Sequence, residues 1–170
     1  MKTLLSVLFL SCMATSLALA GNKIRWPRDV VEWEKLKAST EVAEKEEMGY
    51  AFIFVPTEWG EDLDGSVGRS IAATNDAIRA LKSFCLIVKG DFQAVGAAQR
   101  GKEEAAPKAL VAGVSKAGNS YPLVVVLDTE MKTVLGAVSG QKIHDEGKKV
   151  FRDAKKKFRE IEKAKEEEKK

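Results

Sequence analysis

Three short runs of almost wholly apolar residues constrain the fold of this chain more than any other feature of its sequence. They are residues 50–55, 84–88 and 122–127; Pro56 follows the first, Gly90 lies two residues after the second, and Pro122 begins the third. A strand exposed on one face alternates apolar and polar residues, whereas a strand covered on both faces is apolar throughout. The sequence therefore predicts three central strands in a sheet that is covered on both faces.

Apolar residues at helical spacing lie between these strands and after them. In chain order we expect an edge strand at 24–26, a helix from Asp29 that restarts at Thr40 and ends near Gly49, a strand at 50–55, a helix at 66–81, a strand at 84–88, a loop at 96–102, a helix at 107–118, a strand at 122–127, its hairpin partner at 133–138 and a helix over 143–161. The helix from Asp29 is predicted by a capping box with Glu32.

This order of elements predicts an α/β fold with a three-layer α/β/α sandwich. Crossover connections predict that the early strands are parallel, and the short loop at 128–132 predicts that the last two strands are antiparallel. We therefore expect a mixed sheet with a C-terminal antiparallel hairpin, followed by a long C-terminal helix. One domain would occupy residues 21–161, and residues 162–170 would form a charged helical extension or tail.

Residues 1–20 have the pattern of a secretory signal peptide. Lys2 precedes an apolar stretch at 4–10, and Ala18-Leu19-Ala20 provides the small residues that signal peptidase recognises. The apolar stretch is short for a membrane span. We expect the signal to be cleaved and the protein to be exported to the periplasm or the extracellular space, with no membrane association afterwards. The alternative is lipoprotein processing at Cys12.

The overall charge does not indicate a nucleic-acid partner. The formal net charge of the chain is +3, which is small for a chain of 170 residues. Lysines are concentrated near the C-terminus, but they are interleaved with glutamates, as is typical of a solvated helix end. We therefore expect no nucleic-acid binding.

The region from Ser120 to Gly140 carries the most specific resemblance to a known family. Ser120-Tyr-Pro-Leu-Val-Val-Val-Leu-Asp128, followed by Lys132-Thr-Val-Leu-Gly136 and Gly140, resembles the cis-proline turn, central strand, hairpin and final glycine of the thioredoxin-like family. Pro122 would be the cis-proline, an isomer that costs an X–Pro bond only about 0.5–1 kcal/mol. Trp33 also resembles a common family position. The resemblance covers roughly residues 24–160 and implies a thioredoxin-like fold.

The chain departs from that family where the family performs its redox chemistry. A Trp-Cys-x-x-Cys turn at a helix N-terminus lowers the pKa of the first thiol and creates the attacking thiolate. Here the corresponding stretch is 57–66, in which Trp59 matches the family tryptophan while Gly60 and Leu63 occupy the cysteine positions. The sequence therefore predicts a redox-inactive member that lacks the CxxC motif, with no catalytic residue and no enzyme activity.

Other candidate sites have less support in the sequence. Cys85 is the only cysteine after the signal peptide, and it is either a reactive monothiol or a small apolar residue in a strand. Acidic residues at 58–64 are either a cation site or a solvated loop, and their spacing does not match an EF-hand. His144 has no partner motif and is expected to be a surface residue. We expect no cofactor and no metal.

A groove between Trp59, Tyr121 and Pro122 is the binding site that the family resemblance implies. In that family, the active-site turn and the residue before the cis-proline flank a shallow groove that holds extended peptide. Aromatic residues in surface grooves often anchor a partner. We therefore expect a protein- or peptide-binding module. The alternatives are that the two aromatics merely pack, that the protein acts through the Cys85 thiol, or that it is a structural envelope protein without a ligand.

Overall fold

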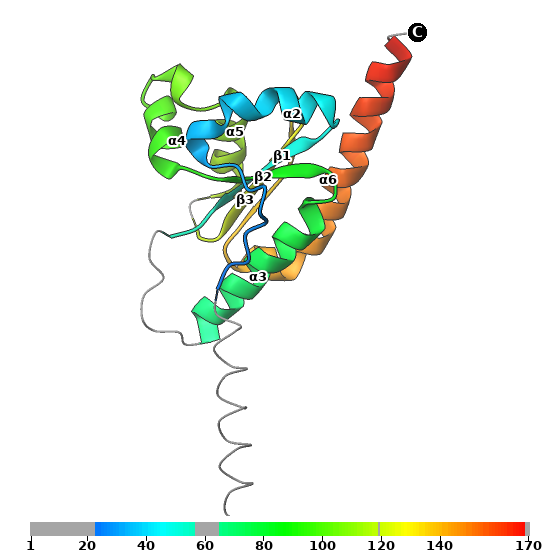
Figure 1. Cartoon of the computed structure of the whole chain (residues 1–170). Coiled ribbons are helices and arrows are strands. Elements are labelled where there is room, and N and C mark those ends of the chain that lie inside the picture. Colours follow the sequence, from blue (N-terminus) through cyan, green and yellow to red (C-terminus); the bar gives the residue numbers. More distant parts are fainter. Residues whose placement is uncertain (1–22, 57–64, 119, 169–170) are drawn as a thin grey trace, which may run out of the picture.

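The central element of the computed structural model is a four-stranded mixed sheet with the order β2-β1-β3-β4 (Figure 1). The structure describes residues 23–56, 65–118 and 120–168. The strands are β1 (Gly49–Phe54), β2 (Cys85–Lys89), β3 (Leu123–Leu127) and β4 (Val134–Ser139). β1 pairs with β2 in parallel and with β3 antiparallel, and β3 pairs with β4 antiparallel. The predicted central strands and the predicted hairpin are confirmed.

Helices cover both faces of this sheet, which gives the predicted three layers (Figure 1). One face packs against α3 (Gly65–Leu81) and α6 (Gln141–Glu168), and the other packs against α2 (Thr40–Lys45), α4 (Phe92–Gln99) and α5 (Lys108–Ala117). Successive side chains of a strand point to opposite faces. In β1, Ala51 and Ile53 join the first core, whereas Tyr50, Phe52 and Phe54 join the second. Burial on both faces is thus the reason for the continuous apolar runs.

The N-terminal segment differs from the sequence-based expectation. Residues 24–26 form no strand, and no helix begins at Asp29. Instead Val31 makes an isolated parallel bridge with Val88 at the free edge of β2, and two 3-10 helices follow at Trp33–Lys35 and Lys37–Ser39. The amide of Val31 donates to the Ile87 carbonyl at 2.8 Å. Pairing with the sheet edge therefore replaces the predicted capping box.

The prediction of a loop at 96–102 is also wrong for residues 96–99, which are helical. α4 continues to Gln99, and Asp91 caps its start by accepting a hydrogen bond from the Gln93 amide at 2.7 Å. Val95 is buried and anchors the helix to the core. A short 3-10 helix at Glu103–Ala105 then leads into α5, which is followed by Gly118. The φ of Gly118 is positive as predicted, at +93°, but its ψ of −178° differs from the predicted left-handed helical conformation.

α6 is the longest helix of the described residues, and it extends past the sheet to Glu168 (Figure 1). Its apolar face carries Ile143, Phe151, Ala154 and Phe158, which pack into the core next to α3. In the parts of the chain that the structure describes, no helix combines the length and the apolarity that a membrane span requires.

Candidate functional site

A groove of about 430 Å³ lies where β1 and β2 end and β3 begins. β1 and β2 are parallel and β3 is antiparallel to them, so the chain segments after Phe54, after Lys89 and before Leu123 meet at one end of the sheet. The groove is lined by residues from these segments and from the first 3-10 helix: Glu32, Trp33, Glu34, Val55, Lys89, Gly90, Asp91, Phe92, Gln93 and Tyr121.

Tyr121 is the exposed aromatic residue of this groove. Its side chain is 42% exposed, and the Tyr121–Pro122 peptide bond is cis, the isomer that the family resemblance implies. The ring meets Phe92 edge-on, with 5.0 Å between ring centroids, and Phe92 in turn lies 4.6 Å from the buried ring of Phe54. A chain of three aromatic rings therefore runs from the core to the surface and supports Tyr121 from below.

Gly90 is required for this aromatic chain. A Cβ atom at position 90 would lie only 2.4 Å from the Phe54 ring, which is closer than side chains approach one another. The absence of a side chain lets the Phe54 ring lie directly against the backbone that follows β2.

The groove lining also includes four charged residues, Glu32, Glu34, Lys89 and Asp91, which we call the charged wall. The Lys89 ammonium donates to the Glu32 carboxylate and lies 5.5 Å from the centre of the Trp26 ring. Asp91 uses one oxygen to cap α4, and Glu34 is exposed. The lining thus contains three carboxylates and one ammonium that is already paired with one of them.

The structure tests only part of the predicted site. Trp59 lies outside the described residues, as do the acidic residues at 58–64, so the predicted approach of Trp59 to Tyr121 stays a prediction. Tyr121 lies in the groove and Pro122 precedes β3. The sequence-based interpretation missed Phe92 and the Glu32–Lys89 pair. The signal that was available for Phe92 is Asp91, a good N-cap residue directly before it.

Cys85 lies apart from the groove, at the start of β2, whereas the groove is at the end of that strand. It is 2% exposed and belongs to the core between the sheet and the helices α3 and α6. Burial raises the pKa of the Cys85 thiol far above its ordinary value, and the charge of Lys155 lowers it only in part. A neutral thiol without solvent access is a poor nucleophile.

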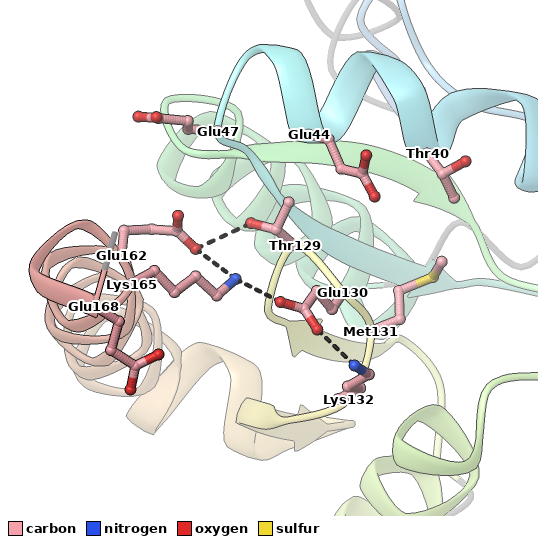
Figure 2. Close-up of a pocket in the computed structure, with 10 residues that line it drawn as sticks. All are labelled: Thr40, Glu44, Glu47, Thr129, Glu130, Met131, Lys132, Glu162, Lys165 and Glu168. Atoms are coloured by element: carbon pink, nitrogen blue, oxygen red, sulfur yellow. Dashed lines mark hydrogen bonds and ion pairs between the residues drawn. The ribbon is translucent and has the colours of Figure 1, made fainter. Parts of the chain in front are cut away.

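A second hollow, of about 760 Å³, lies at the other end of the sheet, between α2, the β3–β4 loop and the end of α6 (Figure 2). Lys165 pairs with Glu130 at 3.1 Å and with Glu162 at 3.2 Å, and Thr129 donates to Glu162 at 3.2 Å. Lys132 pairs with Glu130 at 2.7 Å. These charges are satisfied by one another, so we interpret this cluster as a tether between the β3–β4 loop and α6.

The tether predicts an unusual titration of Glu130. Hydrogen bonds from Lys132 and then from Lys165 lower the pKa of Glu130 to about 2. A lowered folded-state pKa stabilises the fold above the ordinary glutamate pKa of about 4.3, and this contribution is lost as the pH falls through the folded-state pKa. Carboxyl NMR titration should give a Glu130 midpoint near 2. The midpoint should rise in Lys132→Met and in high salt, because the pair is exposed. An unchanged midpoint in Lys132→Met would contradict the tether.

Within the described ranges, no group of three or more histidine, cysteine, aspartate or glutamate side chains could hold a metal ion. His144 is exposed in a surface hollow between α3 and α6, and it is not among the residues that line the groove at Tyr121.

No protein-family model matches this chain. No curated protein matches it either. Among solved structures, the chain is similar to a disulphide isomerase from Xylella fastidiosa Temecula1, with 15% identity and a TM-score of 0.39 over 82% of this chain and 97% of that chain. A likeness this distant carries no argument about the fold or the chemistry of this chain. The mixed sheet with helices on both faces, the C-terminal antiparallel hairpin and the long final helix agree with the α/β fold class that the sequence predicts.

Proposed function

We propose that this protein is exported and that it binds an extended segment of a protein or peptide in the groove at Tyr121, without dithiol redox chemistry. Export is supported by the signal-peptide pattern of residues 1–20. The absence of redox chemistry is supported by the sequence at 57–66, which has no cysteine, and by the buried position of Cys85.

The observation that carries the binding proposal is the exposed Tyr121 ring above Phe92. Exposed aromatic residues that are fixed by packing from below are favourable anchors, because they present a large apolar surface with little conformational entropy to lose. Of the large apolar side chains described, Tyr121 and Val42 are exposed, and Tyr121 is the one that lines a groove. Chain segments after β1, after β2 and before β3 all contribute to the lining, so a ligand in the groove would contact several segments of the domain.

Removing the Tyr121 ring should therefore weaken peptide binding. The secreted chain, without residues 1–20, would be screened against a displayed library of random linear peptides, and the enriched peptides would be measured by calorimetry. We expect Tyr121→Ala to weaken binding by about tenfold or more, the scale of a hot-spot residue.

Val42→Ala provides the matched control, because Val42 is 45% exposed on α2 and does not line the groove. It should leave peptide affinity unchanged. Circular dichroism and the urea midpoint would show that both variants remain folded. If no peptide is enriched, or if the enriched peptides bind Tyr121→Ala as well as the unmodified chain, the proposed function is wrong.

A further inference from the structure

The charged wall of the groove contains more acid than base. Glu32, Glu34 and Asp91 face a single cation, Lys89, whose charge is used by Glu32. Glu34 is exposed on the 3-10 helix that also carries Trp33. Asp91 accepts one hydrogen bond from the Gln93 amide, and an ionised carboxylate has further acceptor sites. The groove therefore has unused acceptors and a net negative charge.

Lys89 shows how a cation is accommodated on this wall. Its ammonium is paired with the Glu32 carboxylate and lies 5.5 Å from the centre of the Trp26 ring. An aromatic face and a carboxylate together hold a cation by cation–π attraction and by a charge-assisted hydrogen bond. The same two kinds of group, the exposed Tyr121 ring and the carboxylates of Asp91 and Glu34, also line this groove.

We infer that the groove selects extended peptides that carry arginine. This inference rests on the proposed function and adds the chemistry of the partner to it. A guanidinium group is planar, stacks on aromatic rings and donates two parallel hydrogen bonds to a carboxylate, so it matches a site with both groups better than an ammonium does. An acidic peptide is disfavoured, because the three carboxylates of the groove lining would repel the carboxylates of the peptide.

The test compares peptides that differ only in charge. One short linear peptide of glycine, serine and leucine carries arginine at its centre, a second carries the neutral isostere citrulline, and a third carries glutamate. Fluorescence anisotropy with the secreted chain should give about tenfold tighter binding of the arginine peptide than of the citrulline peptide. The difference should diminish in high salt, because exposed charges are screened. The glutamate peptide should bind more weakly than both.

Two variants test which residues cause the preference for the arginine peptide. Glu34→Gln combined with Asp91→Asn removes the two available charges while it retains an N-cap for α4, since asparagine caps as well as aspartate does. This double variant should bind the arginine and citrulline peptides equally. Glu104→Gln, an exposed change that is not in the groove, should preserve the preference. Tyr121→Ala should weaken both peptides.

The outcomes separate this inference from the proposed function. Equal binding of arginine and citrulline peptides, with Tyr121→Ala still weakening both, would overturn the arginine preference and leave peptide binding intact. A preference that survives the double variant would overturn the assignment to Glu34 and Asp91. Failure of every peptide to bind, including peptides enriched from the random library, would overturn both proposals.

Discussion

Replacing Phe52 with alanine is expected to destabilise the protein by about 3–5 kcal/mol, the usual cost of removing a fully buried phenylalanine. Phe52 is at the middle of β1, between β2 and β3, and its side chain is completely buried. Its ring lies 6.1 Å from the Tyr50 ring and 6.0 Å from the Trp33 ring. The neighbours are strand backbone and other rings that cannot collapse into the space, so the cavity would remain.

Urea unfolding followed by circular dichroism measures this loss. Because total stabilities are about 5–15 kcal/mol, the midpoint should fall by a large fraction of its value. Val42→Ala removes apolar atoms from an exposed position and should change the free energy of unfolding by about 0.5 kcal/mol at most. If the two variants unfold at the same urea concentration, β1 is not the central strand of the core.

Two glycine-to-alanine changes should have opposite effects on stability. A Cβ atom at Gly49 would lie 2.6 Å from the carbonyl oxygen of Leu127 and 3.2 Å from the Phe158 ring. The carbonyl belongs to β3, which pairs with β1, so it cannot move away without disturbing the sheet. We expect Gly49→Ala to cost about 3 kcal/mol, at the upper end for overpacking.

Gly68 is the matched position, because a Cβ atom there would have no neighbour within 4 Å and the residue lies inside α3. Gly68→Ala should stabilise the protein by up to about 1 kcal/mol through helix propensity. Thermal unfolding would show Tm changes of opposite sign. A loss of stability in Gly68→Ala comparable to that in Gly49→Ala would contradict the packing described for these two sites.

The central strands were predictable from the sequence, because a strand that is buried on both faces is a continuous run of apolar residues. α4 was not, because Gly96 and the surrounding small residues resemble a loop, and the buried contact of Val95 that stabilises the helix is not local. The helix α4, which the sequence did not predict, bears on the direction in which β3 runs. With α4 and α5 both between β2 and β3, the chain returns to the end of the sheet where β2 finished, and β3 runs antiparallel to β1.

The groove was predictable in part. Tyr121 and Pro122 are found from a contiguous segment that resembles a known family, whereas the charged wall joins Glu32 to Lys89 across 57 positions of the sequence. No periodicity or spacing relates such residues. The sequence instead predicted that Glu32 forms a capping box with Asp29. That helix start does not form, because Val31 pairs with Val88 at the edge of the sheet.

The position of Cys85 has a practical consequence for measuring the dynamics of this domain. It is the only cysteine of the described residues, and it lies at the start of β2 with almost no solvent exposure. A thiol-reactive dye can reach it only after β2 and the helices over it separate. When closing is faster than labelling, the labelling rate reports the equilibrium population of that open state. The Cys85 thiol is therefore a natural probe of how often the core of this domain opens under native conditions, without any engineered label.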